Sequence, residues 1–164
     1  MNSWSTSYNN LNKRVRCESL DFDDLSKQEI CEEIKFLQKR HRLSDFYLFK
    51  LDRENSYHAV CLDKMTMRNC WDILRESSCD GAFINSIKNL RTRFWVLRIA
   101  SKGSRSMPIY EKTLTSHNHS RVKSNGHAGF LKEYWKIKIR RIGKWDKETA
   151  IGYIKYNTAN RTKN

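Results

Sequence analysis

The chain has 164 residues, about the size of one ordinary domain, and 38% of them are hydrophobic, which excludes a disordered tail. One proline and six glycines exclude a collagen-like or proline-rich linker protein. The 32 lysines and arginines exceed the 18 aspartates and glutamates, and the net charge is +14. The sequence contains neither an apolar run near the roughly 18 residues of a membrane span nor an N-terminal signal core, which predicts a soluble, cytoplasmic protein.

The positive charge is concentrated in the second half of the chain. Residues 1–82 contain 13 basic and 14 acidic side chains, whereas residues 83–164 contain 19 basic and 4 acidic ones. Such a polycation predicts a phosphate-rich polymer as partner, because each neutralised phosphate releases counterions. An anionic membrane is the alternative, but the sequence shows neither a basic amphipathic helix nor a lipidation motif. Five cysteines without a C-x-x-C pair predict reduced, mostly buried thiols rather than a metal finger.

The order of elements predicts an α+β fold with a mainly antiparallel sheet and helices packed on it. Polar residues 1–14 are predicted to be a flexible N-terminal arm, and residues 159–164 a frayed tail. Residues 15–158 then form a single domain.

Local patterns place the first elements of this domain. Ser26 opens a capping-box pattern, which predicts the start of a helix. Strand-like runs at 46–51 and 57–62, separated by a polar loop, predict a hairpin. A second amphipathic helix is expected to begin at Asp63 or Thr66.

Further strands are predicted along the second half. Residues 93–99 form an apolar strand, and polar residues 113–129 are predicted to be a mobile loop. Apolar and basic residues alternate over 134–142, which predicts a half-buried strand with a cationic face. A last strand is expected at 151–156.

The first motif of chemical interest is Asp21-Phe22-Asp23. In an extended segment Asp21 and Asp23 point to the same face, and two convergent carboxylates suit a divalent cation such as Mg²⁺ or Mn²⁺. The alternative is that these carboxylates only favour the positive end of the helix that follows. Asp80 is a candidate third carboxylate, although Asp80-Gly81 is also a common turn sequence.

Two further motifs could bind phosphate. Ser56 and His58 share a face at the start of a strand, where hydroxyl and imidazole could hold a phosphate or His58 could act as acid or base. A turn serine beside a partly buried histidine is the alternative. Arg98, Lys102 and Arg105 surround a glycine-containing turn after an apolar strand, which suits a phosphate clamp or a solvated basic loop.

In this order the motifs resemble the catalytic core of the archaeo-eukaryotic primase superfamily, over about residues 17–105. The resemblance implies an RRM-like core that transfers nucleotides from nucleoside triphosphates onto a strand paired with a single-stranded DNA or RNA template, with Mg²⁺ or Mn²⁺ as cofactor. It further implies metal binding by Asp21, Asp23 and Asp80, and nucleotide binding by Ser56, His58, Arg98, Lys102 and Arg105. The template would follow the basic strand, at Trp135, Lys136, Lys138, Arg140 and Arg141, where Trp135 and the nearby Trp145 could stack on unpaired bases.

Two other functions remain open. Tyr153 and Tyr156, with the histidines of His117-Asn118-His119, resemble parts of an HUH-type rolling-circle replication initiator, in which a tyrosine is the nucleophile. Alternatively, the chain is a non-catalytic single-strand-binding protein that needs only its cationic surface. Its small size and its content of lysine, arginine and asparagine fit a viral or mobile-element protein.

Overall fold

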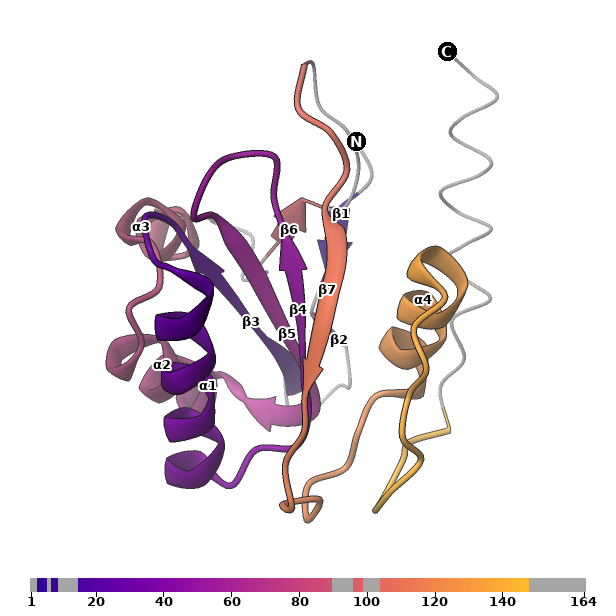
Figure 1. Cartoon of the computed structure of the whole chain (residues 1–164). Helices are drawn as coiled ribbons and strands as arrows, with labels where there is room; N and C mark the ends of the chain where they lie inside the picture. Colours follow the sequence, from indigo (N-terminus) through magenta and orange to yellow (C-terminus); the bar gives the residue numbers. More distant parts are fainter. Residues whose placement is uncertain (1–2, 6, 9–14, 90–95, 99–103, 148–164) are drawn as a thin grey trace.

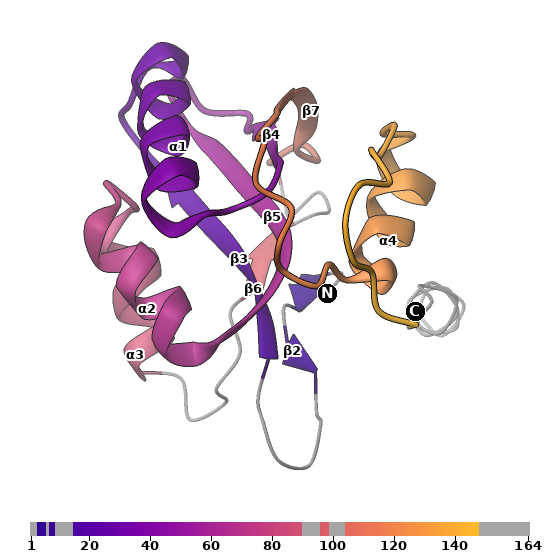
Figure 2. The ribbon, with the colours of Figure 1, turned by 90° about the horizontal axis from the view of Figure 1, so that it is seen from below.

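The computed structural model describes residues 3–5, 7–8, 15–89, 96–98 and 104–147. An antiparallel sheet occupies the centre, with helices on both of its sides (Figures 1 and 2). Three helices cover one face: α1 (Lys27–His41), α2 (Met67–Glu76) and α3 (Gly81–Asn89). A single helix, α4 (Asn125–Trp135), lies over the other face.

The main sheet has the strand order β2-β3-β5-β4-β7, and all neighbouring strands are antiparallel. Its strands are β2 (Ser7–Tyr8), β3 (Val15–Phe22), β4 (Phe46–Lys50), β5 (Tyr57–Thr66) and β7 (Ile109–Leu114). Because β3 and β4 both pair with β5, they run parallel to each other and form a split β-α-β unit around α1. A separate antiparallel pair joins β1 (Ser3–Ser5) to β6 (Val96–Arg98). The α+β class with a mainly antiparallel sheet is thus confirmed.

Helices α1 and α2 begin directly after the predicted capping residues, Ser26 and Thr66. Ser26 Oγ accepts a hydrogen bond from the Glu29 amide, and the Glu29 carboxylate accepts one from the Ser26 amide at 2.8 Å, which completes the capping box of α1. These hydrogen bonds lower the pKa of Glu29. Thr66 caps α2 by accepting from the Asn69 amide. Of the two predicted starts for the second helix, Thr66 is therefore the correct one.

Strand alternation separates the two faces of the sheet. Leu20, Ala59 and Leu48 lie in one cross-strand row, are fully buried and face the three-helix layer. The adjacent row contains Asp21, His58, Phe49 and Tyr110. Phe49 contacts Trp135 of α4 with ring centroids 4.7 Å apart, so this second row faces the α4 side. Asp21 and His58 therefore lie on the face opposite α1.

The predicted strand at 134–142 is wrong. Residues up to Trp135 belong to α4, which Ser124 caps by accepting from the His127 amide, and residues 136–142 pair with no described strand. Ala128 and Leu131 are fully buried, so packing of the α4 face decides the helical state. The burial pattern does alternate, because Ile137 is buried between exposed Lys136 and Lys138, but none of the described strands pairs with this segment.

Other sequence predictions also need correction. The predicted loop at 113–129 contains the end of β7 and the first half of α4. The predicted N-terminal arm contains β1 and β2, which pair with β6 and β3. Of the expected strand at 93–99, the structure describes residues 96–98 as β6. The expected strand at 151–156 and the tail at 159–164 lie outside the described residues.

No described helix combines the length and the apolar character that crossing a membrane requires.

Asp63 provides a pH-dependent contribution to stability. It is fully buried, accepts hydrogen bonds from the Ser44 amide at 2.8 Å and hydroxyl at 2.6 Å, and has a pKa raised by burial. Because its folded-state pKa exceeds the ordinary value of about 4, its contribution is full below about pH 4 and declines as pH rises through the folded-state pKa. The free energy of unfolding of wild type minus that of Asp63→Asn, from urea titrations, should therefore fall between pH 4 and 7. A difference that rises with pH would contradict this.

Candidate functional site

The D-x-D and S-x-H motifs meet at one end of the β3–β5 pair. Strand register places Asp21 opposite His58 and Phe22 opposite Tyr57, so Asp23 follows beside Ser56. The His58 Nε2 atom lies 3.3 Å from Asp21 Oδ1, and the Ser56 hydroxyl donates a hydrogen bond to Asp23 Oδ1. The four side chains thus form two cross-strand pairs on one face, and the two members of each pair are more than 30 positions apart in the sequence.

Turns hold this strand end in place. Asp24 and Asn55 adopt left-handed backbone conformations, with φ of 63° and 50°, which short polar side chains tolerate better than most residues. The Leu25 amide donates to the Asn55 carbonyl at 3.3 Å, and the Leu51 amide donates to the Ser56 carbonyl at 3.0 Å. The segment after Asp23 and the β4–β5 loop are therefore tied together beside the two motifs.

Asp21 and His58 are both largely buried. The side chain of His58 is 8% exposed and that of Asp21 is 21% exposed. Asp21 Oδ1 is buried and accepts no hydrogen bond from any described residue, although His58 Nε2 is within ion-pair distance. A buried carboxylate oxygen without a donor is costly unless a cation or a proton neutralises it. The Asp21 carboxylate is therefore the candidate group at this site for binding a positively charged ligand.

Asp23 is already engaged. Arg53 Nη2 donates to Asp23 Oδ2 at 2.6 Å, while Ser56 donates to the other carboxylate oxygen. The hydrogen bond and charge of Asp23 raise the pKa of Arg53. The Arg53 side chain is 54% exposed, so this ion pair is weak and can open. Arg53 was not among the predicted site residues, and its place in the hairpin loop beside Ser56 was the only signal for it.

Asp80 lies beside Asp21 through its backbone. Its amide donates to the Asp21 carbonyl at 2.7 Å, and the Asp21 amide donates to Cys79 Sγ at 3.2 Å. The Asp80 carboxylate, however, accepts from the Phe83 amide at 2.9 Å at the start of α3. Within the described residues, no three side chains of His, Cys, Asp or Glu are grouped to hold a metal ion. The backbone therefore brings the Asp80 segment beside Asp21. The carboxylates of the three aspartates, however, do not converge on one point.

A divalent cation still fits the Asp21 end of this site. Mg²⁺ is commonly bound through one or two protein carboxylates together with substrate phosphates, so a preformed cage of three ligands is not needed. The unpartnered, buried Asp21 Oδ1 matches that requirement, and Asp23 follows two residues later on the same strand face. Asp23 can contribute only if Arg53 moves away from its carboxylate.

The predicted phosphate clamp is described only in part. Arg105 is exposed, Arg98 is placed by its backbone opposite Ser3, and Lys102 lies outside the described residues. No described contact joins Arg105 to the Asp21–His58 pair.

The predicted nucleic-acid-binding residues have different environments. Trp135 packs on Phe49 and donates from Nε1 to the Pro108 carbonyl at 2.9 Å, so its ring belongs to the core. Arg140 forms two hydrogen bonds with Asp45, at 2.6 and 2.8 Å. Arg141 donates to Asn125 and lies over the Trp145 ring, 4.5 Å from its centroid. Lys136 and Lys138 are exposed to solvent.

The residues of the rolling-circle hypothesis are not brought together in the described part of the chain. His117 is exposed, whereas the His119 side chain is 10% exposed and its Nε2 lies 2.9 Å from the Ser116 carbonyl oxygen. Tyr153 and Tyr156 lie outside the described residues.

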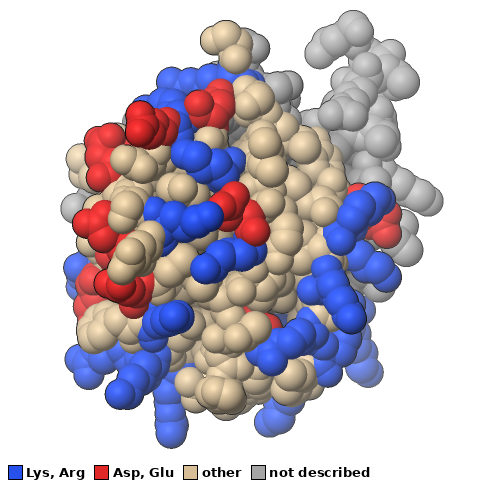
Figure 3. Space-filling view, in the orientation of Figure 1, with Lys and Arg blue, Asp and Glu red and all other residues tan. Residues whose placement is uncertain are grey.

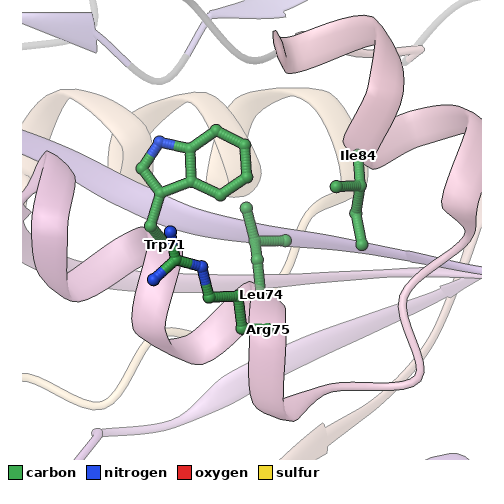
Figure 4. A pocket seen from close by; sticks show the side chains of 4 residues that line it. All are labelled: Trp71, Leu74, Arg75 and Ile84. Atoms are coloured by element: carbon green, nitrogen blue, oxygen red, sulfur yellow. The ribbon is translucent and has the colours of Figure 1, made fainter.

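A pocket of about 290 Å³ is formed by residues of α2 and α3. Its lining residues are Trp71, Leu74, Arg75 and Ile84 (Figure 4). No group that could act on a substrate as acid, base or nucleophile is among them, so we do not assign chemistry to it.

No protein-family model, curated protein or solved structure matches the chain significantly.

Proposed function

We propose that this chain is a metal-dependent nucleotidyltransferase of the primase-polymerase type, acting on a single-stranded template. The observation that supports this most directly is the cross-strand pairing of Asp21 with His58, next to that of Asp23 with Ser56. The split β-α-β unit, with β5 between β3 and β4, also supports an RRM-like core.

Each residue has a distinct role in this proposal. Asp21 and Asp23 would hold Mg²⁺ or Mn²⁺, which when bound activates a 3′-hydroxyl and neutralises the leaving pyrophosphate. Among the described residues, Asp21 is the one whose carboxylate has a buried oxygen without a hydrogen-bond partner. His58 Nε2 lies beside that oxygen, where it can donate to a phosphate oxygen of the incoming nucleotide. Asp80 positions Asp21 through the backbone hydrogen bond between them.

The proposal is tested by incorporation of labelled nucleotides on a primed single-stranded template with Mn²⁺ or Mg²⁺. His58→Gln should raise KM for the nucleotide about tenfold and change kcat less, because one hydrogen bond to a charged group contributes roughly 1.5 kcal/mol. No metal-dependent incorporation by wild type would refute the proposal. DNA covalently attached to Tyr153 or Tyr156 would instead establish the rolling-circle alternative.

Arg53 should compete with the metal for Asp23. Since their ion pair is largely exposed, it contributes about 0.5–1 kcal/mol, so Arg53→Gln should tighten Mn²⁺ binding about two- to fivefold. Isothermal titration of the intact protein with Mn²⁺ and a non-hydrolysable nucleotide measures this directly. Arg68→Gln, which removes the same charge from an exposed position of α2, is the matched control. Equal affinities of the Arg53 and Arg68 variants would show that Arg53 does not compete.

A non-catalytic single-strand-binding protein is the second candidate. The engagement of Asp23 by Arg53 and of the Asp80 carboxylate by the Phe83 amide favours it, since neither carboxylate is free in this structure. This candidate predicts template binding without metal-dependent incorporation.

A further inference from the structure

The end of the molecule opposite the Asp21–His58 pair is strongly cationic. Residues 115–147 contain nine lysines and arginines but only two acidic residues. Figure 3 shows Lys and Arg side chains along the lower edge and the lower right of the molecule. Acidic side chains instead gather at the upper left of that view. The charge of the chain is therefore distributed unequally between the two ends of the sheet.

Three segments far apart in the sequence meet at this cationic end. Arg121 Nη2 donates to the His41 carbonyl at 3.3 Å, which joins the 115–124 segment to the end of α1. The Lys123 amide donates to the Lys144 carbonyl at 2.9 Å, which joins the same segment to residues 136–147. Lys64 forms an ion pair with Asp146 at 2.9 Å and anchors the last segment to β5.

We propose that this surface binds the sugar-phosphate backbone of a single-stranded nucleic acid. We call it the cationic band and define it by the following residues: Arg42, Arg121, Lys138, Arg141, Lys144 and Trp145. The inference does not depend on chemistry at Asp21, because it rests on different residues at the other end of the sheet.

The charges of the band are available to a ligand. Arg42, Lys138 and Lys144 are exposed, and their side chains form no ion pair with another described residue. Exposed cations without ion-pair partners favour a polyanion, because binding releases the counterions of each neutralised phosphate.

Trp145 indicates that the bound nucleic acid is single-stranded. Its indole ring is half-buried, with the Arg141 guanidinium 4.5 Å and the Lys123 ammonium 5.6 Å from the ring centroid. An aromatic ring among cations is the arrangement on which unpaired bases stack, whereas duplex bases are already stacked on each other. Of the two tryptophans predicted to stack on unpaired bases, Trp145 is therefore the candidate, because Trp135 packs on Phe49.

The band and the proposed catalytic site can contact one strand. Asp63, which bridges to Lys123, lies five positions after His58 along β5, and at about 3.3 Å per position this is roughly 17 Å. A short single strand spans this distance. The cationic band would then hold the template, and one end of the bound template would reach the Asp21–His58 pair.

Fluorescence anisotropy with a dye-labelled 20-nucleotide single strand and the full chain tests the proposal. The triple variant Arg42→Asn, Lys138→Gln, Lys144→Gln should bind at least tenfold more weakly than wild type. Its slope of log K against log salt should be shallower by about 2, since each lost phosphate contact contributes about 0.7 for a single strand. Asn is used at Arg42 because the backbone there is left-handed, with φ of 54°.

A matched triple variant controls for net charge. Lys35→Gln, Arg68→Gln and Lys112→Gln also remove three exposed charges, but from α1, α2 and β7. Trp145→Ala should weaken single-strand binding about five- to tenfold and leave duplex binding unchanged, while Trp145→Phe should restore it. Circular dichroism confirms that each variant is folded.

Three results would overturn the proposal: equal losses in both triple variants, no single-strand binding by wild type, or binding to phosphatidylserine vesicles without binding to the oligonucleotide. Nucleotide incorporation is measured separately on the same proteins. Retained strand binding without incorporation would therefore count against the proposed catalysis and not against the cationic band.

Discussion

An Asp21→Asn variant is expected to remain folded and to lose metal-dependent nucleotide incorporation by about a hundredfold or more. The loss corresponds to the several kcal/mol that a bound metal contributes to stabilising charge in the transition state. Stability should not fall, because Asp21 Oδ1 accepts no hydrogen bond from the described residues, and the substitution removes a buried negative charge. Single-turnover incorporation at saturating nucleotide and thermal unfolding measure the two effects.

Asp24→Asn is the matched control for this experiment. Asp24 is close in sequence, exposed, and left-handed with φ of 63°, a conformation that asparagine accepts. The Asp24→Asn variant has the same change in charge as Asp21→Asn and should retain the wild-type rate of nucleotide incorporation. Equal activity of the Asp21 and Asp24 variants would place the metal somewhere other than the β3–β5 end.

Asp45→Ala is expected to be the most destabilising of these substitutions, by about 3 kcal/mol in the free energy of unfolding. Asp45 is 4% exposed and accepts hydrogen bonds from Arg140 and from the Ser116 amide, at 2.6 to 2.9 Å. Its carboxylate raises the pKa of Arg140. Truncation leaves these donors without their acceptor, and urea unfolding should show a midpoint shift with an unchanged m-value.

The same variant links stability to the cationic band. Asp45 precedes β4 and fastens both the segment at Ser116 and the segment at Arg140 to the sheet. Asp45→Ala should therefore also weaken single-strand binding, even though it makes the protein more positive. Asp72→Ala, at an exposed position of α2, changes charge equally and should affect neither property. Tighter strand binding by the Asp45 variant would show that net charge matters more than the arrangement of the band.

The sequence by itself determined the elements whose signals are local. The capping box at Ser26 and the cap at Thr66 act within one turn of their helices, so α1 and α2 begin at predicted positions. The hairpin of β4 and β5 has continuous apolar runs on both sides of a polar loop, and both strands were predicted. The residue order of D-x-D and S-x-H was also visible in the sequence.

Only the tertiary structure decided the remaining elements and the geometry of the site. β3 contains charged residues, and β7 is mostly exposed at the sheet edge, so each is a strand because a neighbouring strand satisfies its backbone. α4 has glycines at two positions and depends on burial of Ala128 and Leu131. The register of Asp21 with His58, the Arg53 ion pair and the hydrogen bond from the Asp80 amide to the Asp21 carbonyl all join distant segments. Local propensity carries no information about such contacts, because they exist only after the chain has packed.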